Sequence, residues 1–130
     1  MTNIFSFDYD NRYFPPAPFV DIEIFSPDTP NNAHKLKAMV DSGADATILP
    51  VKVLKKAGAE MLEEVVVRGM HNIGASTWTY LVSLKIGEYT FHQLEVVSSN
   101  QPNQILLGRD VLNHLIVTLN GLAGVTEISQ

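Results

Sequence analysis

An acid, a hydroxyl and a glycine stand together at Asp41, Ser42 and Gly43, with apolar residues close on both sides, at 38–40 and 46–49. A carboxylate held between core-forming segments can take or give a proton in general acid/base chemistry. The same three residue types are also common in turns, so the triplet alone is compatible with an ordinary turn. The neighbouring elements decide between these interpretations.

Hydrolysis of a peptide bond by this chemistry needs two carboxyl groups. One carboxylate deprotonates a water molecule, and one carboxylic acid polarises the carbonyl. Two carboxyls in contact share one proton, because both cannot be ionised cheaply. No second Asp-Ser/Thr-Gly triplet exists in the 130 residues. If the triplet acts in this way, the second group must come from another copy, and a two-fold dimer would supply it with each Asp41 facing its mate on the axis.

The segments before the triplet predict an antiparallel hairpin. Prolines between 15 and 18 indicate an extended lead-in. Residues 20–24, VDIEI, alternate apolar and charged side chains, and so do residues 34–40, HKLKAMV. Residues 26–32 between them are rich in turn formers. Asp41 is then expected at the end of the second strand.

Two short helices and several more strands are predicted after the triplet. Pro50 suits the first position of a helix that stops at Gly58, and residues 109–115 have helical apolar spacing. Between the helices, three or four strands, a loop and a short buried strand are expected, and a hairpin closes the chain. The frequent short strands favour an all-β sandwich or barrel. The three or four strands are expected within 63–97, with turns at 69–74 and 87–88. The loop is expected at 100–104, the short buried strand at 105–108, and the closing hairpin at 116–119 and 125–128.

Composition excludes several classes of protein. The length fits one domain, and 45% apolar with 18% charged residues is ordinary for a globular chain. A net charge of −5 argues against a nucleic-acid partner. The absence of cysteine excludes disulfides and thiolate chemistry. No apolar run is long enough to span a membrane, and the N-terminal residues do not form a signal peptide, so we expect a cytoplasmic protein without a membrane partner.

Three segments together resemble the retropepsin-like, or retroviral-type, aspartic peptidases: AMVDSGADATIL, VRGMHNIGASTWTYL and ILLGRDVLNHL. The helix after the triplet and the closing hairpin are similar to those of cellular and retroelement members. The resemblance covers about 18–128 of a single domain, 1–130. It implies an all-β, closed acid-protease-like barrel with two short helices, a single-lobe subunit of a two-fold dimer. It also implies a flap hairpin over 67–80 with its tip near 70–74.

The resemblance assigns roles to individual residues. Asp41 is the catalytic acid, Ser42 braces the loops across the axis, and Gly43 allows close approach of the backbone. Asp45 is expected to pair with Arg109 in a partly buried contact. The residues implied to bind a peptide or protein substrate are Ala44, Asp45, His71, Ile73 and Gly74, and those implied to support the loop are Gly108 and Arg109.

The leading hypothesis is therefore a homodimeric aspartic endopeptidase without cofactor. A non-catalytic dimerisation or peptide-binding module of the same fold is the alternative, since fold alone does not establish function. A more remote alternative is a monomeric β-domain in which the triplet forms a plain turn. No metal site is expected, because the four histidines lack ligand spacing: His34, His71, His92 and His114.

Overall fold

The computed structural model describes residues 3–68 and 74–130. Within them the chain forms ten strands and two short helices. In chain order these are β1 Phe5–Asp8, β2 Phe19–Phe25, β3 His34–Val40, β4 Ile48–Pro50, α1 Val51–Lys56, β5 Glu60–Arg68, β6 Gly74–Ile86, β7 Tyr89–Ser99, β8 Leu106–Leu107, α2 Arg109–Leu112, β9 Ile116–Asn120 and β10 Val125–Ser129.

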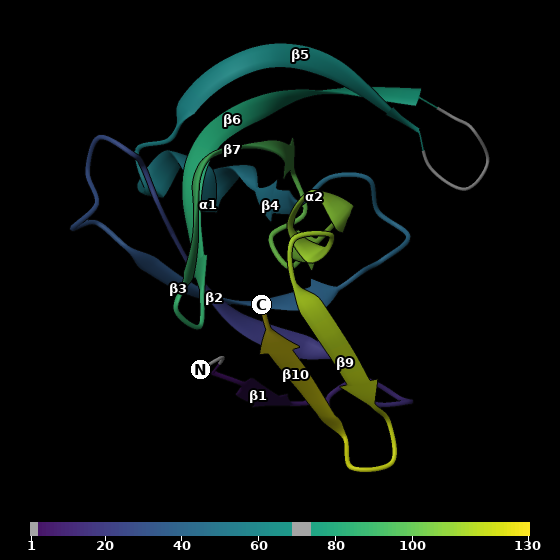
Figure 1. The fold of residues 1–130 in the computed structure, drawn as a ribbon. Coiled ribbons are helices and arrows are strands. Elements are labelled where there is room, and N and C mark those ends of the chain that lie inside the picture. Colours follow the sequence, from purple (N-terminus) through teal and green to yellow (C-terminus); the bar gives the residue numbers. More distant parts are fainter. Residues whose placement is uncertain (1–2, 69–73) are drawn as a thin grey trace.

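The strands are divided between two sheets (Figure 1). The large sheet has the order β2-β3-β8-β4-β7-β6-β5, and β2 also pairs with β6, so the sheet rolls towards itself. The small sheet has the order β1-β10-β9. The mostly-β fold with two short helices agrees with the sequence, and β9 and β10 pair with β1 in a sheet separate from the large one.

The hairpin before the triplet forms as predicted. β2 and β3 are antiparallel, with Phe19 opposite Met39 and Ile24 opposite His34. The alternation of β2 places Val20, Ile22 and Ile24 in the core, where each is at most 2% exposed. Their burial fixes the register, because a slip of one residue would turn this apolar face to water.

Both predicted helices are present and short. α1 starts one residue after the predicted position, because Pro50 remains extended at ψ 137°. Gly58 ends it with a φ of +75°, a conformation that glycine adopts without strain. α2 spans only Arg109–Leu112 and buries Val111 and Leu112. It is shorter than the predicted 109–115, although Leu115 still packs against the core.

Two strands were not anticipated. β1 pairs along its length with β10, with Phe5 opposite Ile128 and Asp8 opposite Val125. β4 is only three residues long and runs parallel to β7. Each is too short for its own pattern to identify it, and each is stabilised by a partner that is distant in sequence.

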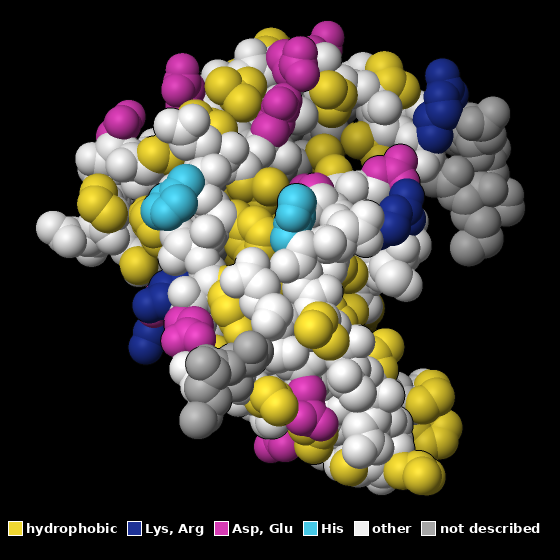
Figure 2. Space-filling view, in the orientation of Figure 1, with side chains coloured by type: hydrophobic (Ala, Val, Ile, Leu, Met, Phe, Trp, Pro, Cys, Tyr) yellow, Lys and Arg dark blue, Asp and Glu magenta, His cyan; other side chains and the backbone are white. Residues whose placement is uncertain are grey.

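The β5–β6 hairpin forms an arm that arches over the rest of the large sheet (Figure 1). Among the described strands, β5 pairs only with β6, and eight of its nine residues are exposed. Acidic and hydrophobic side chains alternate over this upper part of the surface (Figure 2). The described residues of the predicted flap, 67–80, lie at the end of the arm, and of its predicted tip near 70–74 all but Gly74 lie outside the described residues.

Candidate active site

Strand β8 holds both stems of the loop that contains Asp41. β8 runs parallel to the end of β3, with Leu106 opposite Met39 and Leu107 opposite Val40. The same Leu106 lies opposite Ile48 of β4. The Asp41 N–H continues the ladder by donating to the Leu107 carbonyl at 3.0 Å. A strand inserted between β3 and β4 thus fixes where the loop leaves and re-enters the sheet.

The Asp41 carboxylate is oriented by its own loop. Its Oδ1 accepts a hydrogen bond from the Gly43 N–H at 3.0 Å, and the Asp41 carbonyl accepts one from the Ala44 N–H at 3.2 Å. Asp41 is partly exposed, and Ser42 and Gly43 are exposed. Its Oδ2 has no hydrogen-bond partner among residues 3–68 and 74–130. One carboxylate oxygen is therefore held, while the other remains available.

Gly108 allows the start of α2 to lie against this loop. A Cβ at this position would lie 2.5 Å from the Ala46 carbonyl carbon and 2.6 Å from its oxygen, both backbone atoms. The Arg109 N–H next to it donates to the Ala44 carbonyl at 2.9 Å. Only glycine fits here, so the absence of a side chain at this position is what allows α2 to approach the loop so closely.

A hydrogen-bonded bracket of the buried Thr47 and the partly buried Asp110, which the sequence did not reveal, also joins α2 to the loop. The Thr47 N–H and hydroxyl donate to the two carboxylate oxygens of Asp110, at 2.9 and 2.8 Å. The Thr47 hydroxyl oxygen also accepts the Gly108 N–H at 3.2 Å. Thr47 is completely buried. The signals that could have indicated it are a hydroxyl within the apolar run ATIL and an acid directly after Gly-Arg.

Arg109 makes the contact expected of it. Its Nη2 pairs with the Asp45 carboxylate, and its Nη1 donates to the Ser42 carbonyl at 2.8 Å. The expected partial burial is wrong for one partner, because the Asp45 side chain is 90% exposed and that of Arg109 is 43% exposed. An exposed pair adds little to stability, so the contact with Ser42 is the more direct link between α2 and the loop.

The other predicted substrate-binding residues are only partly placed. Ala44 and Asp45 lie in the Asp41 loop. Gly74 begins β6 opposite Arg68, on the described part of the arm. His71 and Ile73 lie outside the described residues. The structure therefore places the predicted loop residues beside Gly108 and Arg109, and leaves the roles assigned to the flap as predictions.

The arrangement can perform proton-transfer chemistry with one carboxyl group per chain. In the described part of the chain, no group of three or more His, Asp or Glu side chains could hold a metal ion. None of its helices has both the length and the apolar character for a membrane span.

A family model described as "gag-polyprotein putative aspartyl protease" matches residues 29–114. The chain belongs to this family. Every predicted site residue of this aspartyl protease family member falls inside the matched range, from Asp41 to Arg109.

Two curated relatives extend the comparison. The family member is 34% identical over 98 residues to the UBA domain-containing protein Mud1 of Schizosaccharomyces pombe, which covers 72% of this chain. It is 26% identical over 137 aligned positions to DNA damage-inducible protein 1 of Kluyveromyces lactis, which covers the whole chain. The chain spans only 27% and 33% of the lengths of these two relatives.

Two solved structures share the fold of this family member. A retropepsin-like aspartic protease from Rickettsia conorii has a TM-score of 0.65 at 18% identity, covering 99% of this chain and 94% of its own. The EIAV protease complexed with the inhibitor HBY-793 has a TM-score of 0.61 at 19% identity, covering 75% and 86%. At these identities the likeness concerns the fold.

Proposed function

We propose that the chain is an aspartic endopeptidase that works as a homodimer, with the Asp41 carboxyls of two copies acting on one water molecule. The observation that carries this proposal is the Asp41 carboxylate itself, with Oδ1 held by the Gly43 N–H and Oδ2 without a partner among the described residues. One ionised carboxyl takes a proton from water, and its protonated mate donates to the substrate carbonyl. A single chain supplies only half of this pair.

The edge strand β9 supports the dimer part of the proposal. It pairs with β10 on one side only, which leaves the backbone groups of its other edge free within the described sheet. Ile116 and Leu119 are 60% and 53% exposed on it. β9 follows α2, whose first N–H binds the Asp41 loop through Ala44. Pairing of two β9 edges about a two-fold axis would bring two Asp41 loops towards each other.

The family membership supports the peptidase part. The matched family is described as an aspartyl protease, and both structural neighbours are proteases by name. The rival function, a dimerisation or peptide-binding module, has no use for an oriented carboxylate with a free oxygen. We therefore place the endopeptidase first.

The experiment that tests the activity is digestion of an unbiased peptide mixture from about pH 4 to about pH 8. We expect cleavage that rises and falls on the acidic side of neutral, because one Asp41 must be ionised and the other protonated. Asp41→Asn, which keeps the side-chain shape, should abolish cleavage and leave the fold intact. Full activity in a clean Asp41→Asn preparation would assign the cleavage to another site.

Sedimentation over a concentration series tests the dimer separately. We expect a monomer–dimer equilibrium that Ile116→Arg shifts to monomer, while Leu122→Arg leaves it unchanged. Leu122 is the matched control because it is fully exposed in the turn after β9. A wild-type chain that stays monomeric at every concentration contradicts the proposal. A dimer that binds peptides without cutting them would establish the rival function.

A further inference from the structure

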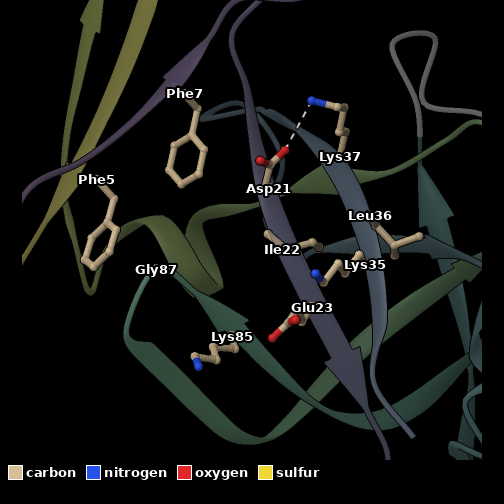
Figure 3. Close-up of a pocket in the computed structure, with 10 residues that line it drawn as sticks. All are labelled: Phe5, Phe7, Asp21, Ile22, Glu23, Lys35, Leu36, Lys37, Lys85 and Gly87. Atoms are coloured by element: carbon tan, nitrogen blue, oxygen red, sulfur yellow. Dashed lines mark hydrogen bonds and ion pairs between the residues drawn. The ribbon is translucent and has the colours of Figure 1, made fainter.

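A hollow of about 550 Å³ lies between β1 and the outer face of the large sheet (Figure 3). None of its lining residues belongs to the Asp41 loop or to α2. Its volume lies within the range of pockets that hold small molecules. The lining residues are Phe5, Phe7, Asp21, Ile22, Glu23, Lys35, Leu36, Lys37, Lys85 and Gly87.

One wall of the hollow is aromatic. Phe5 and Phe7 alternate along β1, so their rings lie on the same face, and both are partly buried. Phe5 packs edge-on against Tyr89, with ring centroids 6.0 Å apart. A Cβ on Gly87 would lie 2.7 Å from the Phe5 ring, so the β6–β7 turn also presses against it. Contacts with Tyr89 and with the β6–β7 turn therefore restrict the position of the Phe5 ring.

The opposite wall is charged. It consists of the outward side chains of β2, β3 and β6, among which Glu23 lies opposite both Lys35 and Lys85. Asp21 and Lys37 form an ion pair at 3.3 Å with both side chains about two-thirds exposed. Three lysines face two acids on this wall, which leaves one positive charge in excess.

Two of these lysines lack an ion pair. Among residues 3–68 and 74–130, neither Lys35 nor Lys85 lies within salt-bridge distance of an acid, and Glu23 has no such partner either. Adjacent strands usually place opposite charges across from each other so that they attract. Here the side chains remain apart, and both lysines line the hollow (Figure 3).

We propose that this hollow binds a small amphipathic carboxylate. Its apolar body lies against the Phe5 and Phe7 rings, and its carboxylate accepts hydrogen bonds from Lys35 and Lys85. The excess of positive charge selects an anion over a cation, and charge-assisted hydrogen bonds are the strong ones. A purely apolar molecule would leave the charged wall desolvated without compensation.

A ligand in this position touches both sheets. Phe5 and Phe7 belong to the small sheet with the β9 edge, whereas the lysines belong to the large sheet with the β5–β6 arm. A ligand that binds only the folded state raises its stability in proportion to its occupancy. The melting temperature should therefore rise with ligand concentration.

Titration of the wild-type chain with octanoate, followed by amide chemical shifts and by calorimetry, tests the site. We expect saturable one-site binding with the largest shifts at residues that line the hollow, such as Gly87. The double variant Lys35→Gln/Lys85→Gln should bind at least about tenfold more weakly. Octan-1-ol, which has the same body without the charge, should also bind at least about tenfold more weakly.

The matched control is Lys55→Gln/Lys56→Gln, which removes two exposed lysines from α1 and should leave octanoate binding unchanged. Because Lys35 and Lys85 are exposed, the test variant should keep the wild-type melting temperature without ligand. Equal affinity in the two double variants, or shifts that never saturate, would overturn the proposal. The titration does not use catalysis, so its outcome is independent of whether Asp41 hydrolyses peptides.

Discussion

The Asp41 loop and the β5–β6 arm are held in opposite ways. The loop is fixed by β8 at both stems and by contacts from Gly108, Arg109 and Asp110. In the arm, the outer strand β5 is fixed among the described strands only by its ladder with β6, and it exposes almost every residue. Catalytic groups need a fixed position, whereas a cover must open to admit substrate. The contrast between these two regions is what the proposed activity requires.

The largest effect is expected from Gly108→Ala. The added Cβ would meet the backbone of Ala46, which cannot turn aside as a side chain can. We expect a loss of about 3 kcal/mol in the free energy of unfolding, measured by urea denaturation. Gly121→Ala is the matched control, because nothing lies within 4 Å of its added Cβ. That change should cost less than about 0.5 kcal/mol. Equal tolerance at both positions would contradict the close approach of α2 to the loop.

Thr47→Val should have the next largest effect. It removes the hydroxyl that binds Asp110 and accepts the Gly108 N–H, while it keeps the side-chain shape. The buried Gly108 N–H and the partly buried Asp110 carboxylate each lose a partner, so we expect a loss of about 1–3 kcal/mol in the free energy of unfolding. Thr47→Ser retains the hydroxyl and should recover most of this loss.

The reverse substitution, Val66→Thr on the arm, is the comparison for Thr47→Val in the bracket. Val66 is 58% exposed, so Val66→Thr should alter the free energy of unfolding by less than about 0.5 kcal/mol. If both substitutions had the same effect in urea denaturation, the two regions would not differ in the way that the contacts indicate.

Asp45→Asn should change stability little and substrate binding more. Its carboxylate is 90% exposed where it meets Arg109, so the free energy of unfolding should change by less than about 1 kcal/mol. We expect KM to rise for cleaved peptides while kcat changes less, because the Asp41 carboxyl is untouched. A large stability loss with unchanged KM would make Asp45 part of the bracket instead.

The smallest effect on stability is expected from Asp10→Asn. Asp10 lies outside both the Asp41 loop and the β5–β6 arm. Hydrogen bonds from the Arg12 side chain and backbone lower the pKa of Asp10 from 3.8 to about 2. The folded state therefore binds this proton more weakly than the unfolded state. The resulting stabilisation is present above the unfolded pKa and is lost as the pH falls towards the folded value. Asp10→Asn should flatten the decline in urea midpoint between about pH 4 and about pH 2.

Sequence patterns predicted the elements whose signal is local. The alternation in 20–24 and 34–40 predicted β2 and β3, and Gly58 predicted the end of α1. In β1, the alternation of Phe5 and Phe7 was present, but four residues are too few to identify a strand without the pairing to β10.

The candidate site was likewise predictable only where its signal lies in a short stretch of sequence or in the family resemblance. The residue types at Asp41–Gly43 indicated the chemistry, and the resemblance indicated the contact of Asp45 with Arg109. Thr47 and Asp110 are 63 positions apart, so only the folded chain shows that they bind each other. The sequence alone also did not indicate that β9 and β10 pair with β1 instead of with the large sheet.

The contact between the Asp41 loop and the start of α2 has a consequence for synthesis of the protein. The hydrogen bonds that tie this part of the chain to Gly108 and α2 join residues 61 to 67 positions apart. A ribosome-bound chain that has been made only as far as β7 contains the whole Asp-Ser-Gly triplet but lacks β8 and α2. Closing so long a segment costs entropy and slows folding. The triplet is therefore held in its final geometry only late in synthesis, when residues 107–110 become available to fold against it.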